Sequence, residues 1–265
     1  MGILKGIFGR RRLKSERPKA SNLAMIALRS SEAVDLNAIV ERLRSADGVP
    51  RSNGVPDVGN GSAVVQIDGF TIGLTHIGFP IPWSDLEWPV KTAWTWPDAE
   101  AVVKEHRSHV LVFASSEQAE IVQISLVLVR AVCASIEETE AVAVYYGNAS
   151  IVVPADRYLA QAAGSSATDL PLFLWLGFHP VQGAGLSIYT TGMPVFGLLD
   201  LEVNESALDL ERLVDFVADL AHYEIAGAVQ IEDGESVGAS EIERITVRHR
   251  PSRFGANAIT CQIQL

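Results

Sequence analysis

The sequence predicts an α+β (mixed α/β) fold, in which helices flank largely antiparallel sheets in two lobes. Three observations favour this class. Apolar runs short enough for strands alternate with stretches whose apolar residues recur at helical spacing. The turn Asp68-Gly69 between two such runs is typical of a tight hairpin, which joins antiparallel strands. Hydrophobic residues make up 48% of the 265 residues and charged residues 20%, which is ordinary for a packed protein.

The first predicted lobe spans residues 21–116 and has the element order β-α-β-β-α-β. A segment rich in Gly, Pro, Asn and Asp at 47–61 is expected to be a loop. The order of elements is that of a split βαβ motif, so we expect a ferredoxin-like arrangement. The elements are expected at residues 23–28, 34–43, 63–67, 71–75, 98–106 and 110–114.

Residues 117–265 are expected to form the second α+β lobe. The stretch 208–223 shows the clearest amphipathic pattern, because Leu213, Val217 and Leu220 fall on one helical face. Helices are expected at residues 117–135, 154–163 and 208–223. Strands are expected at residues 141–146, 172–178, 186–190, 196–203, 228–231, 242–247 and 258–263.

The first residues of the chain differ sharply in charge from the rest. Residues 1–19 hold seven basic residues and one acidic residue, whereas the remainder holds 14 basic and 31 acidic residues. We expect residues 1–20 to be a basic, disordered leader. As an alternative, residues 1–13 could contact an anionic membrane or a partner, because their apolar side chains share one helical face next to arginines. The residues of this contact would be Ile3, Leu4, Ile7, Phe8, Arg10, Arg11 and Arg12.

The overall composition excludes several classes of protein. A net charge of −11 and a pI of about 5.0 oppose a general nucleic-acid binder, since neutralising phosphates needs a basic surface. Two cysteines cannot form a disulfide framework, and neither a secretory signal nor a transmembrane run is recognisable. We therefore expect a cytoplasmic protein, with peripheral contact at the inner face of the membrane as the alternative. No motif predicts a cofactor, a metal site or catalytic residues.

A segment rich in tryptophan and proline between residues 79 and 97 is the most distinctive feature. Because prolines interrupt regular structure, this segment is expected to be a rigid, extended connection. Its tryptophans could cover the sheet or form a groove for a partner or ligand, since tryptophan is common at binding hot spots. The candidate partner-binding residues are Trp83, Asp85, Glu87, Trp88, Trp94 and Trp96, with the two acids as a polar rim.

Histidines offer an alternative chemistry. His106 and His109 have the spacing of a metal-ligand pair on a helix, but they fall where a helix ends and a strand begins, so structural roles are favoured. An enzyme would need a site assembled from distant residues, for example His76, Asp85, Glu87 and His109.

The last third of the chain resembles a known family. The segments are Thr191-Gly-Met-Pro-Val-Phe-Gly197, then Leu201-Glu-Val203, then the predicted helix at 208–223, then Ile231-Glu-Asp-Gly-Glu-Ser-Val-Gly238. Over residues 90–250, where Ala93-Trp94 and His106 also fit, the chain resembles the bacterial family called domain of unknown function 4261. The resemblance implies a bacterial, soluble, cytoplasmic protein and transfers no activity. Some such domains resemble immunity or accessory proteins of toxin systems.

These observations favour a non-enzymatic bacterial binding protein that acts on a protein partner, as an immunity or accessory protein does. An acidic body suits a basic partner through electrostatic steering. Two alternatives stay open. One is a membrane-recruited adaptor that uses the basic N-terminus, and the other is an enzyme whose site is assembled from distant residues.

Overall fold

The computed structural model describes residues 20–45, 57–238, 245–255 and 258–265. The chain divides into two compact units between Trp175 and Leu176. The first unit comprises Arg17–Trp175, and the second comprises Leu176–Leu265 in the described part of the chain. Each unit contains one sheet with helices packed on it, so the α+β class with largely antiparallel sheets is confirmed.

The sheet of the first unit has the strand order β2-β3-β4-β5-β1-β6-β7, and its neighbouring strands pair antiparallel. Strands β3 and β4 form the expected hairpin. Asp68 and Gly69 adopt φ values of 42° and 82°, as a tight turn of this kind requires. The strands are β1 (Ala20–Leu28), β2 (Asp57–Gly59), β3 (Ser62–Ile67), β4 (Phe70–Ile77), β5 (Ser108–Ser116), β6 (Ala141–Tyr146) and β7 (Ile151–Pro154).

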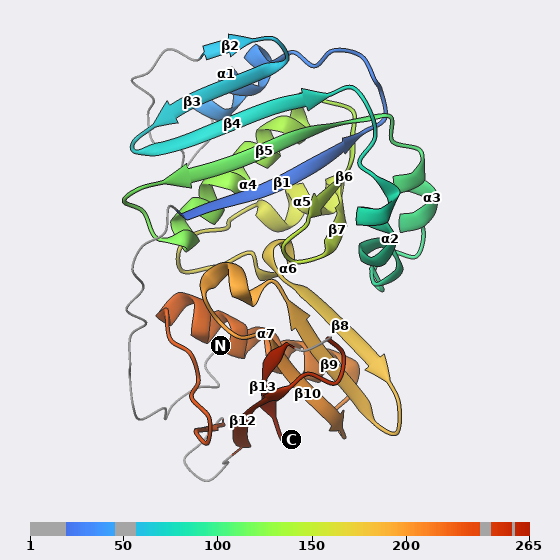
Figure 1. The fold of residues 1–265 in the computed structure, drawn as a ribbon, viewed down its shortest axis with the longest axis vertical. Coiled ribbons are helices and arrows are strands. Elements are labelled where there is room, and N and C mark those ends of the chain that lie inside the picture. The colour runs from blue at the N-terminus through green and yellow to red at the C-terminus, as the bar shows by residue number, and fades with distance from the viewer. Residues whose placement is uncertain (1–19, 46–56, 239–244, 256–257) are drawn as a thin grey trace. The chain divides into compact units, whose positions relative to one another are not determined.

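Helix α4 (Ile121–Glu137) packs on β1 and β5, and α1 (Leu36–Ser45) packs on α4 and β3, so both cover one face of this sheet (Figure 1). The sequence starts α4 with a capping box, in which Gln123 accepts a hydrogen bond from the Glu120 N–H. Alternate residues of β5, namely Val110, Val112 and Ala114, are fully buried beneath it. The other helices are α2 (Trp83–Lys91), α3 (Ala99–Lys104), α5 (Ala155–Ala162) and α6 (Leu172–Trp175).

The strand order differs from the ferredoxin-like expectation. That motif needs two parallel strands with one strand between them. Here β1 and β3 are separated by β4 and β5, and every pairing between these strands is antiparallel. The expected boundary between residues 116 and 117 falls between β5 and α4, inside the first unit. Helix α4 belongs to this unit because it packs on β1 and β5, and β6 belongs to it because it pairs with β1.

The second unit contains a sheet with the strand order β11-β12-β13-β10-β9-β8, in which β10 and β13 pair parallel and the other pairs are antiparallel. Helix α7 (Leu210–Gly227) packs on β9 and β10, as the amphipathic pattern at 208–223 predicts. The strands are β8 (Gly177–Gln182), β9 (Leu186–Thr191), β10 (Leu201–Ser206), β11 (Ser236–Val237), β12 (Ile245–Pro251) and β13 (Ile259–Ile263), with a 3₁₀ turn at Met193–Phe196.

Three segments predicted as strands differ in the structure. The segment 196–203 becomes a strand only from Leu201 on, after the 3₁₀ turn at Met193–Phe196. The run 172–178 splits into α6 and the start of β8, because an unbroken apolar run has no period that separates helix from strand. Residues 228–231 form no strand. The Ile231 N–H donates to the side chain of Glu224 at 2.7 Å and not to the backbone of a neighbouring strand. The buried glutamate thus takes the place that a strand carbonyl would have as acceptor.

Candidate functional site

The tryptophan-rich segment folds as a helix, and the prediction of an extended connection is wrong for its central part. Helix α2 runs from Trp83 to Lys91 with Pro89 inside it. Proline interrupts a helix by removing one backbone N–H and crowding the preceding turn. Pro89 lies in the last turn of α2, where it cannot donate the hydrogen bond that an N–H at this position would make one turn back, and the helix ends two residues later at Lys91. The proline ring is buried and contributes to packing.

Two of the four tryptophans pack on the core. Trp83 and Trp96 are partly buried against an apolar cluster that joins α2 and α3 to the sheet. The Lys104 ammonium lies 4.7 Å from the centroid of the Trp83 ring, within the range of a cation–π interaction. These two tryptophans therefore cover the core. The cluster consists of Ala27, Ile81, Leu86, Val90, Ala99, Val103, Ala143 and Val152.

The other two tryptophans face solvent. Trp88 is 55% exposed and Trp94 is 44% exposed. The end of α2 lies between these two tryptophans in the chain. Its backbone is held by Thr92, whose N–H and hydroxyl both donate to the Trp88 carbonyl at 3.0 Å. Arg157 of α5 holds the turn that follows, donating to the Thr95 hydroxyl at 2.8 Å and to the Thr95 carbonyl at 3.1 Å. The two exposed rings thus stand on backbone that is fixed on both sides.

Acidic residues precede Trp88 on α2. Asp85 and Glu87 are exposed on α2, and Glu87 pairs with Lys91 at 2.7 Å. Residues 83–105 hold five acidic and two basic residues, so the electrostatic potential of this region is negative. We call Asp85, Glu87, Trp88 and Trp94 the α2 surface.

The candidate contact residues in the basic leader lie outside the described residues. They are Ile3, Leu4, Ile7, Phe8, Arg10, Arg11 and Arg12.

The histidines near α2 have structural partners. The Ile81 N–H donates to Nε2 of His106 at 2.8 Å, and Nδ1 of His106 donates to the Val103 carbonyl. Nδ1 of His109 donates to the Phe79 carbonyl at 2.9 Å. Burial lowers the pKa of both imidazoles, and the nearby His76 lowers the pKa of His109 further. The neutral forms are therefore favoured.

Of the catalytic constellation considered above, His76 and His109 lie close enough for His76 to lower the pKa of His109. In the described part of the chain, no hydrogen bond or ion pair joins Asp85 or Glu87 to His76 or His109. The Asp85 carboxylate accepts from the Ser84 hydroxyl at 3.4 Å. Among the described residues, no group of three or more His, Cys, Asp or Glu side chains is arranged to hold a metal ion.

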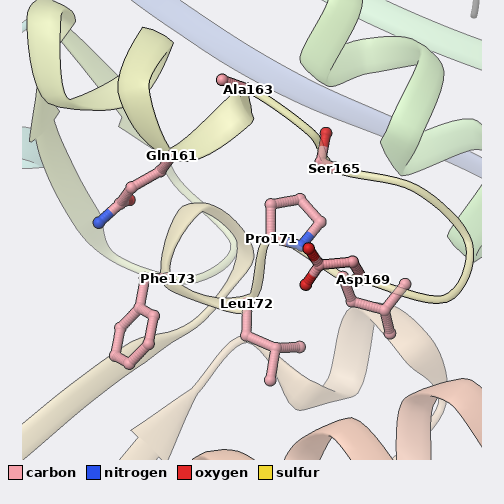
Figure 2. A pocket seen from close by; sticks show the side chains of 8 residues that line it. Gln161, Ala163, Ser165, Asp169, Pro171, Leu172 and Phe173 are labelled. Atoms are coloured by element: carbon pink, nitrogen blue, oxygen red, sulfur yellow. The ribbon is translucent and has the colours of Figure 1, made fainter.

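A hollow of about 260 Å³ lies between the end of α5 and the start of α6 (Figure 2). Its eight lining residues are mainly apolar, and Gln161, Ser165 and Asp169 supply its polar side chains. No imidazole, thiol or basic side chain lines it, and among the described residues the buried Ser165 hydroxyl has no hydrogen-bond partner, so it is not paired with the Asp169 carboxylate. The α2 surface is therefore the stronger candidate for function in the first unit.

The second unit contains a buried carboxylate that sequence reasoning missed. Glu202 of β10 is fully buried, and five donors surround it. A buried charge is tolerated when hydrogen bonds satisfy it, and these bonds tie β10 to the β12–β13 connection. The donors come from residues up to 60 positions away, so no local motif shows them. They are the side chains of Asn204, Ser252, Thr260 and Gln262 and the backbone N–H of Arg253, at 2.7–3.3 Å.

The described helices include none that is both long and apolar enough to cross a membrane. The fold and the α2 surface define an α+β protein of two units with exposed aromatic rings in an acidic setting. The model of a family described as Domain of unknown function (DUF4261) matches residues 189–262, from β9 to β13 in the second unit. This is the family that the sequence resembles, now placed on a shorter segment. Searches of curated proteins and of solved structures found no significant match.

Proposed function

We propose that this chain is a binding protein that receives a protein partner at the α2 surface. The observation that carries the proposal is the exposure of Trp88 and Trp94, 55% and 44%, on a well-fixed helix end. Large aromatic side chains bury much area at a small cost in conformational entropy, and tryptophan is enriched among residues that dominate binding energy. Side chains of this size that are about half exposed present apolar area that a partner can cover.

The charges around the rings indicate the chemistry of the partner. Asp85 and Glu87 flank Trp88 on α2, and the segment 83–105 is net acidic. A basic protein would be steered to this region, and its arginine or lysine side chains could lie over the indole faces. The matching proposal for the whole chain is a non-enzymatic bacterial cytoplasmic protein, of the immunity or accessory type, that binds a basic partner. The net charge of −11 supports the basic character of the partner.

The test is affinity capture from the cytosol of the cells that make the protein, followed by titration with the purified partner. The bait proteins are the wild type, the double variant Trp88→Ala/Trp94→Ala and the control Val64→Ala, whose side chain on β3 is 39% exposed. We expect a basic protein to bind the wild type and the control. The double variant should weaken binding by about tenfold or more, since each hot-spot residue contributes ~2 kcal/mol.

Two results would contradict the proposal. One is a captured partner that binds the double variant as tightly as the wild type while circular dichroism shows that both are folded. The other is a partner whose affinity does not fall with added salt, because steering by acidic residues is screened by ions. The Val64→Ala control separates the loss of any exposed apolar side chain from the loss of these two rings.

A membrane-recruited adaptor is the second candidate, and the charge of residues 1–19 favours it, with seven basic residues against one acidic residue. Basic residues next to apolar ones bind anionic lipid surfaces. Sedimentation with vesicles containing phosphatidylserine tests this candidate. Binding by the full chain that is lost on deletion of residues 1–19 would support it, and equal sedimentation of both proteins would exclude it.

A further inference from the structure

We propose that His106 and His109 form a pH-sensitive latch on the connection leading into α2, in which neutral His106 holds the Ile81 end and releases it when protonated, while His109 keeps its bond to Phe79 in either state. The latch would control whether the α2 surface is held in place. The latch rests on the proposed function in one respect: release of α2 would regulate binding if the α2 surface receives a partner. The release of the connection itself is measured without any partner.

The connection between β4 and α2 carries both contacts of the latch. It contains Phe79 and Ile81, four and two residues before the first residue of α2. Ile81 is buried in the apolar cluster that seats α2 and α3 on the sheet. Displacing Ile81 would therefore disturb the packing of both helices.

His106 holds the Ile81 end of this connection, and its tautomer follows from its partners. A backbone N–H can only donate, so the Ile81 N–H requires an unprotonated Nε2, which it meets at 2.8 Å. The proton of the neutral ring is then on Nδ1, which donates to the Val103 carbonyl at the end of α3. His106 thus bridges α3 and the connection, and it can do so only as the neutral imidazole.

His109 of β5 holds the Phe79 end. A carbonyl can only accept, so Nδ1 of His109 carries the proton that it shares with the Phe79 oxygen at 2.9 Å. The ring of Phe79 meets the imidazole edge-on, with 6.0 Å between the ring centroids. Two buried imidazoles therefore hold one short connection at two points.

Protonation would break the His106 contact directly. A proton added at Nε2 points an N–H at the N–H of Ile81, so the hydrogen bond is lost and two donors oppose each other. The new charge would also lie close to His109, whose own protonation is opposed by His106 and by His76 of β4. Burial also lowers the pKa of both rings, because it disfavours the charged form. A second protonation would add repulsion to the same region.

The charged groups on the surrounding elements point to solvent. Asp85, Glu87 and Lys91 on α2, and Glu100 and Lys104 on α3, are exposed. Glu87 pairs with Lys91 and Glu100 with Lys104, and Asp85 accepts a hydrogen bond from the Ser84 hydroxyl. Beside His106 in the chain, Glu105 faces Arg29 at 4.0 Å and Arg107 is exposed. Burial therefore dominates the pKa of both rings, and the neighbouring imidazoles lower the pKa of His109 further.

The direction of the pH response follows from linkage. A histidine whose pKa is lower in the folded state than its ordinary value of 6.5 favours folding above 6.5, and this contribution is lost as the pH falls through the lowered folded value. The latch is therefore closed at neutral pH and opens in acid. A pair of histidines held only by packing would show the same pKa direction without freeing the Ile81 N–H.

Amide hydrogen exchange at Ile81, corrected for the intrinsic effect of pH on exchange, tests the latch in the full chain. Between pH 7.5 and pH 5.5 we expect Ile81 to lose protection, by up to about tenfold for each pH unit between the ordinary histidine pKa of 6.5 and the lowered folded value. The amide of Leu128 inside α4 should stay protected at both pH values. Equal protection of Ile81 at both values, or a parallel loss at Leu128 that indicates global unfolding, would overturn the proposal.

The variant His106→Gln separates titration from packing. Its side-chain amide keeps one acceptor and one donor and carries no titratable group, so Ile81 protection should no longer depend on pH. The control His222→Gln, on α7 of the second unit, should behave like the wild type. A wild-type response in His106→Gln would overturn the latch. Should that variant not fold, the ring ¹⁵N shifts of wild-type His106 decide instead: they must show the Nδ1–H form at pH 7.5.

The two proposals fail separately. If Ile81 exchange is independent of pH while Trp88→Ala/Trp94→Ala loses the partner, the latch is wrong and the proposed function stands. If Ile81 responds to pH as described while the tryptophan variant binds normally, the latch is present and the proposed binding surface is wrong.

Discussion

At the scale of single residues, two buried glutamates in the second unit show how differently one side chain can be accommodated. Glu202 receives five donors. Glu224 of α7 receives the Gln230 amide at 2.8 Å and the Ile231 N–H at 2.7 Å, both on Oε1. Its Oε2 has no partner among the described residues. Burial accordingly raises the pKa of Glu224 from 4.5 to about 8, so its carboxyl is protonated near neutral pH.

The variant Glu224→Gln tests this assignment. A carboxyl whose folded pKa is raised makes the protein most stable below its unfolded value of 4.5, and stability is lost as the pH rises through about 8. We expect the wild type to lose ~2 kcal/mol of unfolding free energy from this group between pH 6 and pH 8. The glutamine keeps the acceptor for Ile231 and should not lose it. Urea denaturation at both pH values measures the difference.

The exposed variant Glu232→Gln is the control for that experiment, because it removes one carboxyl from the turn that follows without touching the buried one. It should retain the wild-type pH dependence. The same pH dependence in Glu224→Gln as in the wild type would show that Glu224 is ionised throughout this range.

Gly177 is a second residue whose identity the structure explains. A Cβ at this position would lie 2.3 Å from Nε2 of His179 and 2.4 Å from the Thr191 hydroxyl, a pair that hydrogen-bonds at 2.9 Å. Gly177→Ala should destabilise the second unit by about 1–3 kcal/mol, because the imidazole or the strand must move. Thermal unfolding followed by circular dichroism measures this. Gly183→Ala, whose Cβ would approach nothing closer than 3.8 Å, is the matched control and should melt with the wild type.

At the scale of elements, the sequence predicts structure well where periodicity is clear. The hairpin β3–β4 and helix α7 follow their patterns, since alternate or helically spaced apolar residues occupy one buried face. Helix α2 could not be predicted, because its prolines oppose a helix locally and the burial of Leu86, Pro89 and Val90 against distant strands outweighs that preference. Only tertiary contacts, which the spacing does not show, separate Trp83 and Trp96 from the exposed Trp88 and Trp94.

Helix α7 allows a quantitative test at this scale. Asp209 is its N-cap, and its carboxylate accepts a hydrogen bond from the Arg212 N–H at 2.9 Å. Asp209→Ala should lower the free energy of unfolding by about 1 kcal/mol, since it leaves a helix N–H without its partner. Asp215→Ala removes an exposed acid from the interior of the same helix and should change stability little. Equal effects of the two variants would indicate loss of charge rather than loss of the cap.

At the scale of the whole molecule, the fold class was predictable and the division of the chain was not. Antiparallel sheets follow from short strands joined by turns. The observed division between Trp175 and Leu176 lies in an unbroken apolar run at 172–176, which carries none of the Gly, Pro or polar residues that mark a linker. Sequence reasoning instead placed a boundary near 116, where a polar turn separates β5 from α4.

The two divisions make opposite predictions for fragments of the chain. The strand pairs of the first sheet all lie between Ala20 and Pro154, and those of the second between Gly177 and Ile263, so a cut after Trp175 removes no pairing between described strands. A cut after Ser116 removes α4 from β1 and β5 and separates β6 from β1. We expect fragments 17–175 and 176–265 each to fold cooperatively, and fragments 17–116 and 117–265 each to lose cooperative structure.

Proton NMR spectra and thermal melts of the four fragments decide between the divisions. Fragment 17–116 would expose Val110, Val112 and Ala114, which α4 buries in the full chain, and the sheet would present its apolar face to water. Such a surface favours aggregation over folding. A well-dispersed spectrum and a sharp melt for 17–116 would show that α4 is dispensable and would restore the boundary near 116. Dispersed spectra for 17–175 and 176–265 alone would show that each sheet, with its own helices, is sufficient to specify its fold.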